Sequence, residues 1–447
     1  MSHRSKANQD SSRVITIVFL ALLIDLLGFT LILPLFPSML DYYGKTDRLY
    51  QSMQHSVDWF ADVIGVPSER KYNSVLFGGL IGTIFSLLQF LLSPVTGAAS
   101  DYFGRRLLMM LTTAGLIASY ALWAISRNFG LFLLSRVVGG MSKGNVSLST
   151  AIIADLPSPQ ARSKGMAMIG VAFSLGFTIG PMMGAYFASN AGKDEAFFLQ
   201  PAQLALMFAV SDLLFIFFFL PETLPKHKRV RNKFQEAIDL LSPVALFQFS
   251  AVQRRQKDSR SLEGVKNLKV LGLVYFLYLF LFSGLEYTLG FLTHQRFHFN
   301  SMQQGKMFFF VGITMAMIQG GYARRIKPGD EIKVVKRAFF LLIPAFILIG
   351  WAKRVIVLYI GLFLYSFAAA VVVPCLSTLV SAFGGADQKG TTMGILRSLG
   401  ALARALGPIV AATVYWLAGA EVCFTATSAF FLIPIGLLTV PIAKKME

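Results

Sequence analysis

Seven ionisable residues lie inside long apolar stretches of this 447-residue sequence, where charged side chains are rare and usually functional. They comprise three acids and four bases: Asp25, Asp212, Glu286, Arg136, Lys143, Arg397 and Arg404. Buried carboxylic acids bind and release protons near neutral pH, whereas cations that have lost their water attract anions strongly. This set of residue types suits a protein that exchanges protons for an anionic solute.

The four cations form two pairs with the same spacing. Arg136 and Lys143 are seven residues apart, and so are Arg397 and Arg404. Seven residues make two turns of an α-helix with only about 20° of drift, so each pair is expected on one helix face. A cationic face turned toward lipid is costly, and both pairs are therefore expected to face the interior of the protein.

Lys143 and Arg404 lie nearest the centres of their apolar stretches, and we expect them to contact a substrate anion. Arg136, Asn145 and Arg397 complete the predicted substrate contacts. Asn145 begins an Asn-Val-Ser glycosylation sequon, but it lies within an apolar stretch, which argues against glycosylation. Its amide is instead expected to donate hydrogen bonds to the substrate.

Ion pairs that only stabilise the fold are the alternative role for these cations. Arg397 is the most open to this alternative, because Asp101 and Asp155 are possible partners near the same membrane face. Arg136 is explained equally well as a structural residue.

Three acids are predicted to carry the coupled proton. Asp25 and Glu286 are the first choices, because a buried carboxyl group holds a proton at a higher pH than an exposed one. Asp212 is the third, with an interior hydrogen bond or ion pair as its alternative role.

The composition identifies a polytopic membrane protein. Hydrophobic residues make up 55% of the chain and charged residues 14%, with a mean hydropathy of +0.61. A soluble domain is about a quarter charged. The net charge of +18 raises the question of nucleic-acid binding, but no basic-aromatic patch or DNA-binding motif accompanies it. We interpret the basic residues as determinants of membrane topology and expect no nucleic-acid partner.

Enzyme and metal chemistry have no signature in the sequence. Cys375 and Cys423 lie in apolar segments without a metal-ligand spacing. No phosphate-binding glycine-rich loop or nucleophile with a base partner is present, which argues against an ATP-driven pump. We expect neither a cofactor nor a metal.

Twelve apolar segments are long enough to span a bilayer, which takes about 20 residues each. They are residues 14–36, 74–96, 107–126, 130–152, 164–188, 202–220, 269–293, 305–323, 335–351, 355–382, 390–417 and 422–442. The even number places both termini on one side, and most Lys and Arg residues fall in segments on that side. The positive-inside rule therefore places both termini in the cytosol.

The predicted fold is an all-α membrane protein of twelve transmembrane helices in two pseudo-symmetric six-helix halves. Its parts are a cytosolic tail (1–13), an amino-terminal half (14–220), a cytosolic central linker (221–268), a carboxy-terminal half (269–442) and a short cytosolic tail (443–447). An internal repeat supports the division. Residues 163–187 and 388–416 each contain Lys-Gly, Met, Ser-Leu-Gly and Gly-Pro in that order. Repeated halves with helices interrupted by Gly or Pro are typical of secondary transporters.

The segment "GAASDYFGRR" joins the second and third predicted spans. Its glycines, Gly97 and Gly104, permit a tight turn, and Asp101 can cap a helix or pair with an arginine. Arg105 and Arg106 are expected to hold the turn in the cytosol. A plain basic turn is the alternative, but a degraded copy, "GGYARRIKPGD", follows the eighth span and favours a specific role.

This sequence resembles the major facilitator superfamily, and within it the drug:proton antiporter branch that includes the tetracycline exporters. The resemblance covers residues 14–443 and rests on "GAASDYFGRR", the arginine of "SRVVGG", "GVAFSLGFTIGPMMG" and "FLPETL". It implies a V-shaped twelve-helix fold with a central substrate cavity and rocker-switch alternating access. By this resemblance the gating residues are Gly97, Asp101, Gly104 and Arg105, with Arg106 beside them, and the antiporter motif residues Gly176, Gly180, Pro181 and Gly184.

The predicted function is secondary active transport of amphipathic, drug-like organic anions, coupled to protons. The first alternative is a proton-coupled exporter of cationic or zwitterionic drugs such as tetracycline. The second is a membrane partner or scaffold that transports nothing. The expected partners are the organic anion, the proton and the lipid bilayer, and the protein is expected to be a monomer. The sequence leaves open the plasma membrane and the endomembranes, including the nuclear envelope and the lysosome.

Overall fold

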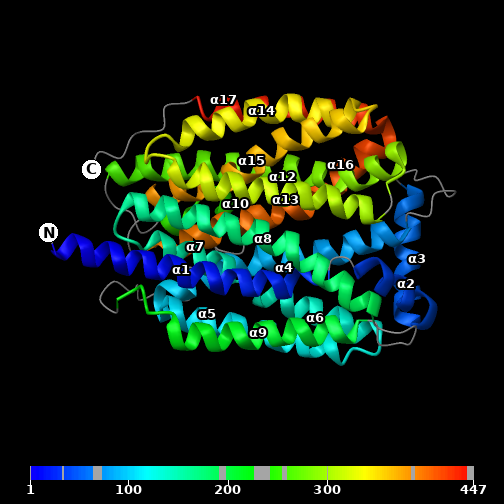
Figure 1. Ribbon diagram of the computed structural model, residues 1–447, viewed down its shortest axis with the longest axis horizontal. Coiled ribbons are helices and arrows are strands. Elements are labelled where there is room, and N and C mark those ends of the chain that lie inside the picture. The colour runs from blue at the N-terminus through cyan, green and yellow to red at the C-terminus, as the bar shows by residue number, and fades with distance from the viewer. Residues whose placement is uncertain are drawn as a thin grey trace.

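The computed structural model describes residues 2–32, 35–63, 73–190, 198–225, 242–253, 259–299, 301–383 and 388–439. These residues form helices connected by short turns, and no strand occurs among them. The long helices run side by side along the long axis of the molecule (Figure 1). Such an arrangement satisfies every helical backbone group without water, as a bilayer requires.

The first group of long helices occupies the lower part of the view in Figure 1. It comprises α1 (Ser2–Thr30), α4 (Asn73–Phe103), α5 (Arg105–Ala124), α6 (Phe129–Ser142), α7 (Asn145–Ala154), α8 (Pro159–Asn190) and α9 (Leu199–Phe219). Two shorter helices, α2 (Phe36–Thr46) and α3 (Arg48–Val63), lie at the end opposite the amino terminus (Figure 1).

The second group occupies the upper part of the view. It comprises α12 (Ser259–Phe297), α13 (Ser301–Gly321), α14 (Glu331–Trp351), α15 (Val355–Phe383), α16 (Lys389–Phe430) and α17 (Leu432–Leu437), with a 3-10 turn at Ala323–Arg325. The short helices α10 (Pro243–Phe247) and α11 (Ser250–Gln253) precede α12. They belong to the predicted central linker, of which residues 226–241 and 254–258 lie outside the described residues.

The helices agree with the predicted spans, with two differences. Within the described ranges, nine helical segments are long and apolar enough to cross a membrane, and α6–α7, α13 and α14 match the other three predicted spans. The last two spans are joined into α16, where Gly419 (φ 84°, ψ 171°) makes the bend between them. Glycine tolerates this backbone conformation without steric cost.

The second difference corrects the span predicted at residues 130–152. The sequence predicts one continuous helix there, but α6 ends at Ser142 and α7 begins at Asn145. Lys143 has ψ 59°, outside the helical region, and Gly144 is packed tightly against Thr96 and Thr112. The helix therefore breaks at the residue that carries the central cation.

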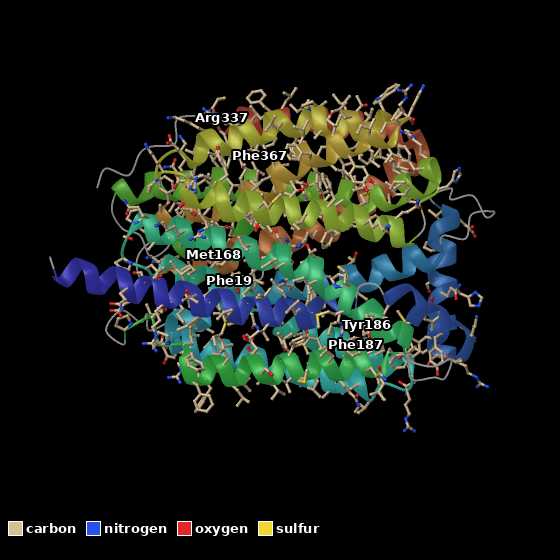
Figure 2. All side chains as sticks on the ribbon, in the orientation of Figure 1. Phe19, Met168, Tyr186, Phe187, Arg337 and Phe367 are labelled. Atoms are coloured by element: carbon tan, nitrogen blue, oxygen red, sulfur yellow. The ribbon has the colours of Figure 1, made fainter. Side chains whose placement is uncertain are left out.

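The surface has the distribution of residues that a bilayer favours. Large apolar side chains such as Phe218 and Ile356 are exposed along the helices. Figure 2 shows Tyr186 and Phe187 near the α2–α3 end, and Arg337 near the end that holds the amino terminus. Aromatic rings and basic groups near helix ends are typical of membrane–water interfaces. The chain is a multi-pass membrane protein.

Candidate functional site

The two groups of helices meet most closely where α4 crosses the beginning of α16. Gly97 of α4 packs against the backbone of Gly390 and Gly394, and a Cβ atom at Gly97 would clash with both. Asp101 Oδ1 accepts a hydrogen bond from the Gly390 amide (2.9 Å), and Asp101 Oδ2 accepts two from Thr391, from N (2.7 Å) and Oγ1 (2.6 Å). Asp101 thus caps the first turn of α16, where a helix dipole favours a negative charge.

A buried arginine completes this contact. Arg105 is fully buried and donates from Nη1 to Asp101 Oδ1 (2.6 Å) and from Nε to Asp155 Oδ2 (3.0 Å). Its Nη1 also donates to Ser100 Oγ (2.7 Å). Gly104 reaches φ 107° at the turn before α5, which glycine adopts easily. The structure therefore brings Gly97, Asp101, Gly104 and Arg105 together at one end of the bundle. We call this set, with Gly390 and Thr391, the α4–α16 junction.

Arg106 lies beside the junction rather than in it. Its side chain donates from Nη2 to the Phe217 carbonyl and lies 5.7 Å from the Phe217 ring. Glu222 accepts hydrogen bonds from the backbone amides of Arg105 (3.0 Å) and Arg106 (3.3 Å). Glu222 belongs to the "FLPETL" segment, and its type and position alone predict no role for it. The contact of Thr391 with Asp101 could not be predicted from the sequence, because it joins segments about 290 residues apart.

The antiporter motif residues pack α8 against α1. Gly176 and Gly184 lie so close to α1 that neither position has room for a Cβ atom. Gly180 meets Thr30, whose Oγ1 donates to the Gly176 carbonyl (2.9 Å). Pro181 lies inside α8, which continues past it. These residues hold two neighbouring helices in backbone contact, as small residues do in membranes.

An amino-terminal charge cluster surrounds the break between α6 and α7. Lys143 Nζ forms an ion pair with Asp25 Oδ2 of α1 (2.7 Å), and both side chains are buried. Asp212 of α9 is 1% exposed, and within the described residues neither of its carboxylate oxygens has a hydrogen-bond partner. Asp212 is close enough to Asp25 and Lys143 to interact with both electrostatically. We define the amino-terminal charge cluster as Asp25, Lys143 and Asp212.

Arg136 and Asn145 lie next to this cluster in different surroundings. The Arg136 guanidinium stacks over Trp123 (5.5 Å) and Phe132 (5.6 Å), and its Nη2 lacks a hydrogen-bond partner in the described part of the chain. Asn145 is fully buried; its Oδ1 accepts from Thr112 Oγ1 (2.6 Å). Its Nδ2 donates a longer bond (3.3 Å) to a second threonine of α5. The Asn145 amide is therefore already hydrogen-bonded within the protein.

A carboxy-terminal charge cluster, defined here as Glu286, Arg397 and Arg404, lies between α12 and α16. Arg397 is 6% exposed, donates from Nη1 to Tyr275 Oη (3.4 Å) and has an Nε without a partner among the described residues. Arg404 is partly exposed and interacts electrostatically with Tyr275, Arg397 and Glu286.

The pairing proposed as the alternative role of Arg397 does not occur in this structure. Asp101 and Asp155 bind Arg105, and Arg397 points instead toward Tyr275. The ion pairs found over the described ranges include neither Arg397 nor Arg404. Two interior cations therefore lack an acidic partner in direct contact.

The other surface features of the described residues offer no alternative functional site to these two clusters. An open groove of about 400 Å³ between α1 and α9 is lined by Arg13, Ile17 and Phe215 among others, and none of the predicted site residues lines it. No grouping of three or more His, Cys, Asp or Glu residues able to hold a metal occurs in the part of the chain that the structure describes.

A family model described as Major Facilitator Superfamily matches residues 18–408. The chain is 64% identical over 430 residues to the human "Major facilitator superfamily domain-containing protein 10", covering 95% of this chain and 92% of the relative. It is 26% identical over 403 residues to the class B tetracycline resistance protein of Escherichia coli, covering 88% and 86% of the two chains.

The crystal structure of the human organic anion transporter MFSD10 (TETRAN) has the same fold. The TM-score is 0.90 at 62% sequence identity, and the match covers 96% of this chain and 99% of the human one.

Proposed function

The chain belongs to the major facilitator superfamily of transporters, and we propose that it moves amphipathic organic anions by alternating access in exchange for protons. The resemblance that the sequence motifs indicated is thereby confirmed, as is the twelve-helix fold. The protein is a transporter rather than an enzyme. The substrate class, the coupling ion and the roles of single residues belong to the proposal.

The observation that carries the proposed substrate class is the pair of unpaired interior arginines. Arg397 and Arg404 hold two positive charges between α12 and α16 with one carboxylate nearby and no direct ion pair in the described residues. Uncompensated cations in a site with little water attract anions. The description of the human relative as an organic anion transporter, at 62% identity, supports the same substrate class.

The proposed role of Lys143 is secondary to that of the arginines. Asp25 occupies its ammonium group in this structure, so an anion contacts Lys143 only after that ion pair opens. Arg136 and Asn145 stay predicted substrate contacts with less support, because aromatic rings cover Arg136 and two threonines bind the Asn145 amide.

We propose that the amino-terminal charge cluster carries the proton. A charged carboxylate without a hydrogen bond is costly to bury, which favours a proton on Asp212 in this state. Loss of that proton would make Asp212 compete with Asp25 for Lys143. Glu286, the other predicted carrier, lacks this support, because it is water-accessible and lies near Arg404.

We propose that the α4–α16 junction is the cytosolic gate and is closed here. Exposed Arg324 and Arg325 follow α13 at the end of the bundle where α4 also ends, and basic residues favour the cytosolic side. Opening the gate requires Asp101 to release Gly390 and Thr391 as the two six-helix halves, 14–220 and 269–442, rock apart. The antiporter motif on α8 would serve as a hinge within the first half.

Uptake into proteoliposomes tests the proposal. The purified protein is given labelled 2-naphthoate or the cation N,N,N-trimethyl-2-naphthylammonium, with and without a pH gradient. We expect gradient-dependent uptake of the anion, loss of that uptake in Arg404→Ala, and normal uptake in the matched control Arg337→Ala, whose side chain is exposed on α14.

The outcomes separate the alternatives. Uptake of the cation in preference to the anion would support a tetracycline-type exporter and contradict our proposal. The absence of any uptake under either gradient would favour the non-transporting scaffold. Anion uptake that survives in Arg404→Ala would show that the arginine pair does not bind the substrate.

A further inference from the structure

Glu286 differs from the other acids that lie near interior cations. Asp25 and Asp101 each form an ion pair, with Lys143 and Arg105 respectively, and are nearly inaccessible to water. The Glu286 side chain is accessible to water, although protein atoms surround its carboxylate closely. A side chain with both properties lies at the wall of an internal space rather than against lipid.

The groups around Glu286 show which way its side chain points. Its carboxylate interacts electrostatically with Arg404 of α16 and with the hydroxyl groups of Tyr278 and Tyr365. Tyr365 belongs to α15 and stacks on Phe282 of α12, with ring centroids 4.6 Å apart. Glu286 therefore points toward α15 and α16, inside the helix bundle.

The charges of the carboxy-terminal charge cluster are unequal. Arg404 interacts with both Glu286 and Arg397, so the cluster holds two guanidinium groups and one carboxylate, with one net positive charge. If Glu286 served only to stabilise the fold, a direct ion pair like that of Glu421 with Arg296 would be expected. Its carboxylate instead lies near Arg404, and no ion pair joins the two among the described residues.

We propose that Glu286 is a charge filter that limits the cargo to organic monoanions. This inference rests on the proposed transport of organic anions. One carboxylate on the cargo neutralises the single net charge of the cluster. A second carboxylate on the same cargo is repelled by Glu286, while Lys143 is already paired with Asp25 and aromatic rings cover Arg136. Like charges several ångströms apart repel more strongly near a protein surface than in bulk water, so binding of the second carboxylate is disfavoured.

Binding to the purified, full-length protein tests the filter. Isothermal titration at pH 7.4 compares 2-naphthoate with naphthalene-2,6-dicarboxylate, which carries the second charge, and with the monomethyl ester of that dicarboxylate, which has similar size but one charge. We expect the wild type to bind both monoanions at least roughly tenfold more tightly than the dianion, by Coulomb repulsion at several ångströms in a partly screened site.

One variant and its matched control test whether Glu286 causes the preference for monoanions. In Glu286→Gln the preference for monoanions should fall by roughly tenfold, because the removed charge no longer repels the second carboxylate. Glu331→Gln is the matched control; it changes a buried glutamate at the first residue of α14, and the preference should stay as in the wild type. The ester comparison needs no variant, so the proposal stays testable if Glu286→Gln does not fold.

Each result decides one proposal. An unchanged preference in Glu286→Gln, or a wild type that binds the ester as weakly as the dianion, overturns the charge filter. If 2-naphthoate binds in a manner that requires Arg404 while either of these results is obtained, the filter fails and the proposed function stands. If the wild type binds no anion, the proposed function fails and the filter with it.

Discussion

The two charge clusters use the same residue types in opposite ways. In the amino-terminal charge cluster, Lys143 and Asp25 are buried in direct contact, and the nearby Asp212 carboxylate has no hydrogen-bond partner among the described residues. In the carboxy-terminal charge cluster, Arg397 and Arg404 outnumber Glu286 and no ion pair joins them in the described part of the chain. A closed acid–base pair suits proton exchange, whereas an open excess of positive charge suits an anion. In our proposal, the two halves of the molecule therefore perform different tasks.

The largest expected effect is on folding stability. Asp25→Asn leaves the buried Lys143 without its counter-charge, and breaking a buried ion pair from one side costs about 3–5 kcal/mol. We expect a large fall in the thermal unfolding temperature, measured in detergent. The double variant Asp25→Asn with Lys143→Met should recover most of the loss. A single variant as stable as the wild type would show that the amino-terminal cluster is not a closed pair.

Arg404→Ala should weaken anion binding while leaving folding stability nearly unchanged. Arg404 is partly exposed and forms no ion pair among the described residues, so we expect the free energy of unfolding to change by less than about 1 kcal/mol. The affinity for 2-naphthoate should fall by at least roughly tenfold, because a lost charge contact with a bound anion is worth about 1.4 kcal/mol or more. A strongly destabilised Arg404→Ala protein would mean that both clusters are structural.

Asp212→Asn separates proton coupling from binding. Asparagine imitates the protonated carboxyl in size and charge, so we expect stability and 2-naphthoate affinity to stay within about twofold of the wild type. Uptake driven by a pH gradient should be lost, while exchange of internal for external 2-naphthoate continues. Gradient-driven uptake that persists in this variant would remove Asp212 from the coupling mechanism.

The smallest expected effect concerns the contact between the two groups of helices. Thr391→Val removes one of the three hydrogen bonds that Asp101 accepts from α16, worth about 1 kcal/mol. The closed junction should open about fivefold more often, measured as faster labelling of a cysteine that replaces Ser93, a buried α4 residue of similar size beside Gly394. Unchanged labelling would mean that the side-chain hydroxyl does not hold the gate, and that the backbone contacts suffice.

Hydropathy and charge predicted the spans well, because a membrane leaves few alternatives for a long apolar segment. The turn containing Asp101 and Arg105 was also predictable, since its glycines, acid and arginines occur together in the sequence. Both features depend on residues that are close along the chain, so a short stretch contains the necessary information.

Partners distant in the sequence were not predictable. The ion pair between Lys143 and Asp25 joins residues 118 positions apart, and it occupies one of the two cations that the sequence favours for substrate contact. The break after α6 was missed because the surrounding residues are apolar and hydropathy cannot distinguish a broken helix from a continuous one. Likewise, only the packing of α12 shows that Glu286 is accessible to water while it faces Arg404.

The hydrogen bonds at Asp101 give the α4–α16 junction an uneven tolerance to mutation. Two of the three donors are backbone amides, which no amino-acid exchange short of proline removes. The acceptor is a single side chain, so one nucleotide change in its codon eliminates all three bonds together. Substitutions on the α16 side are therefore expected to have little effect on the proposed gate, provided that Gly390 and Gly394 stay small. On the α4 side all three hydrogen bonds depend on Asp101, so if the junction is the gate, single substitutions there are expected to cause inherited loss of transport.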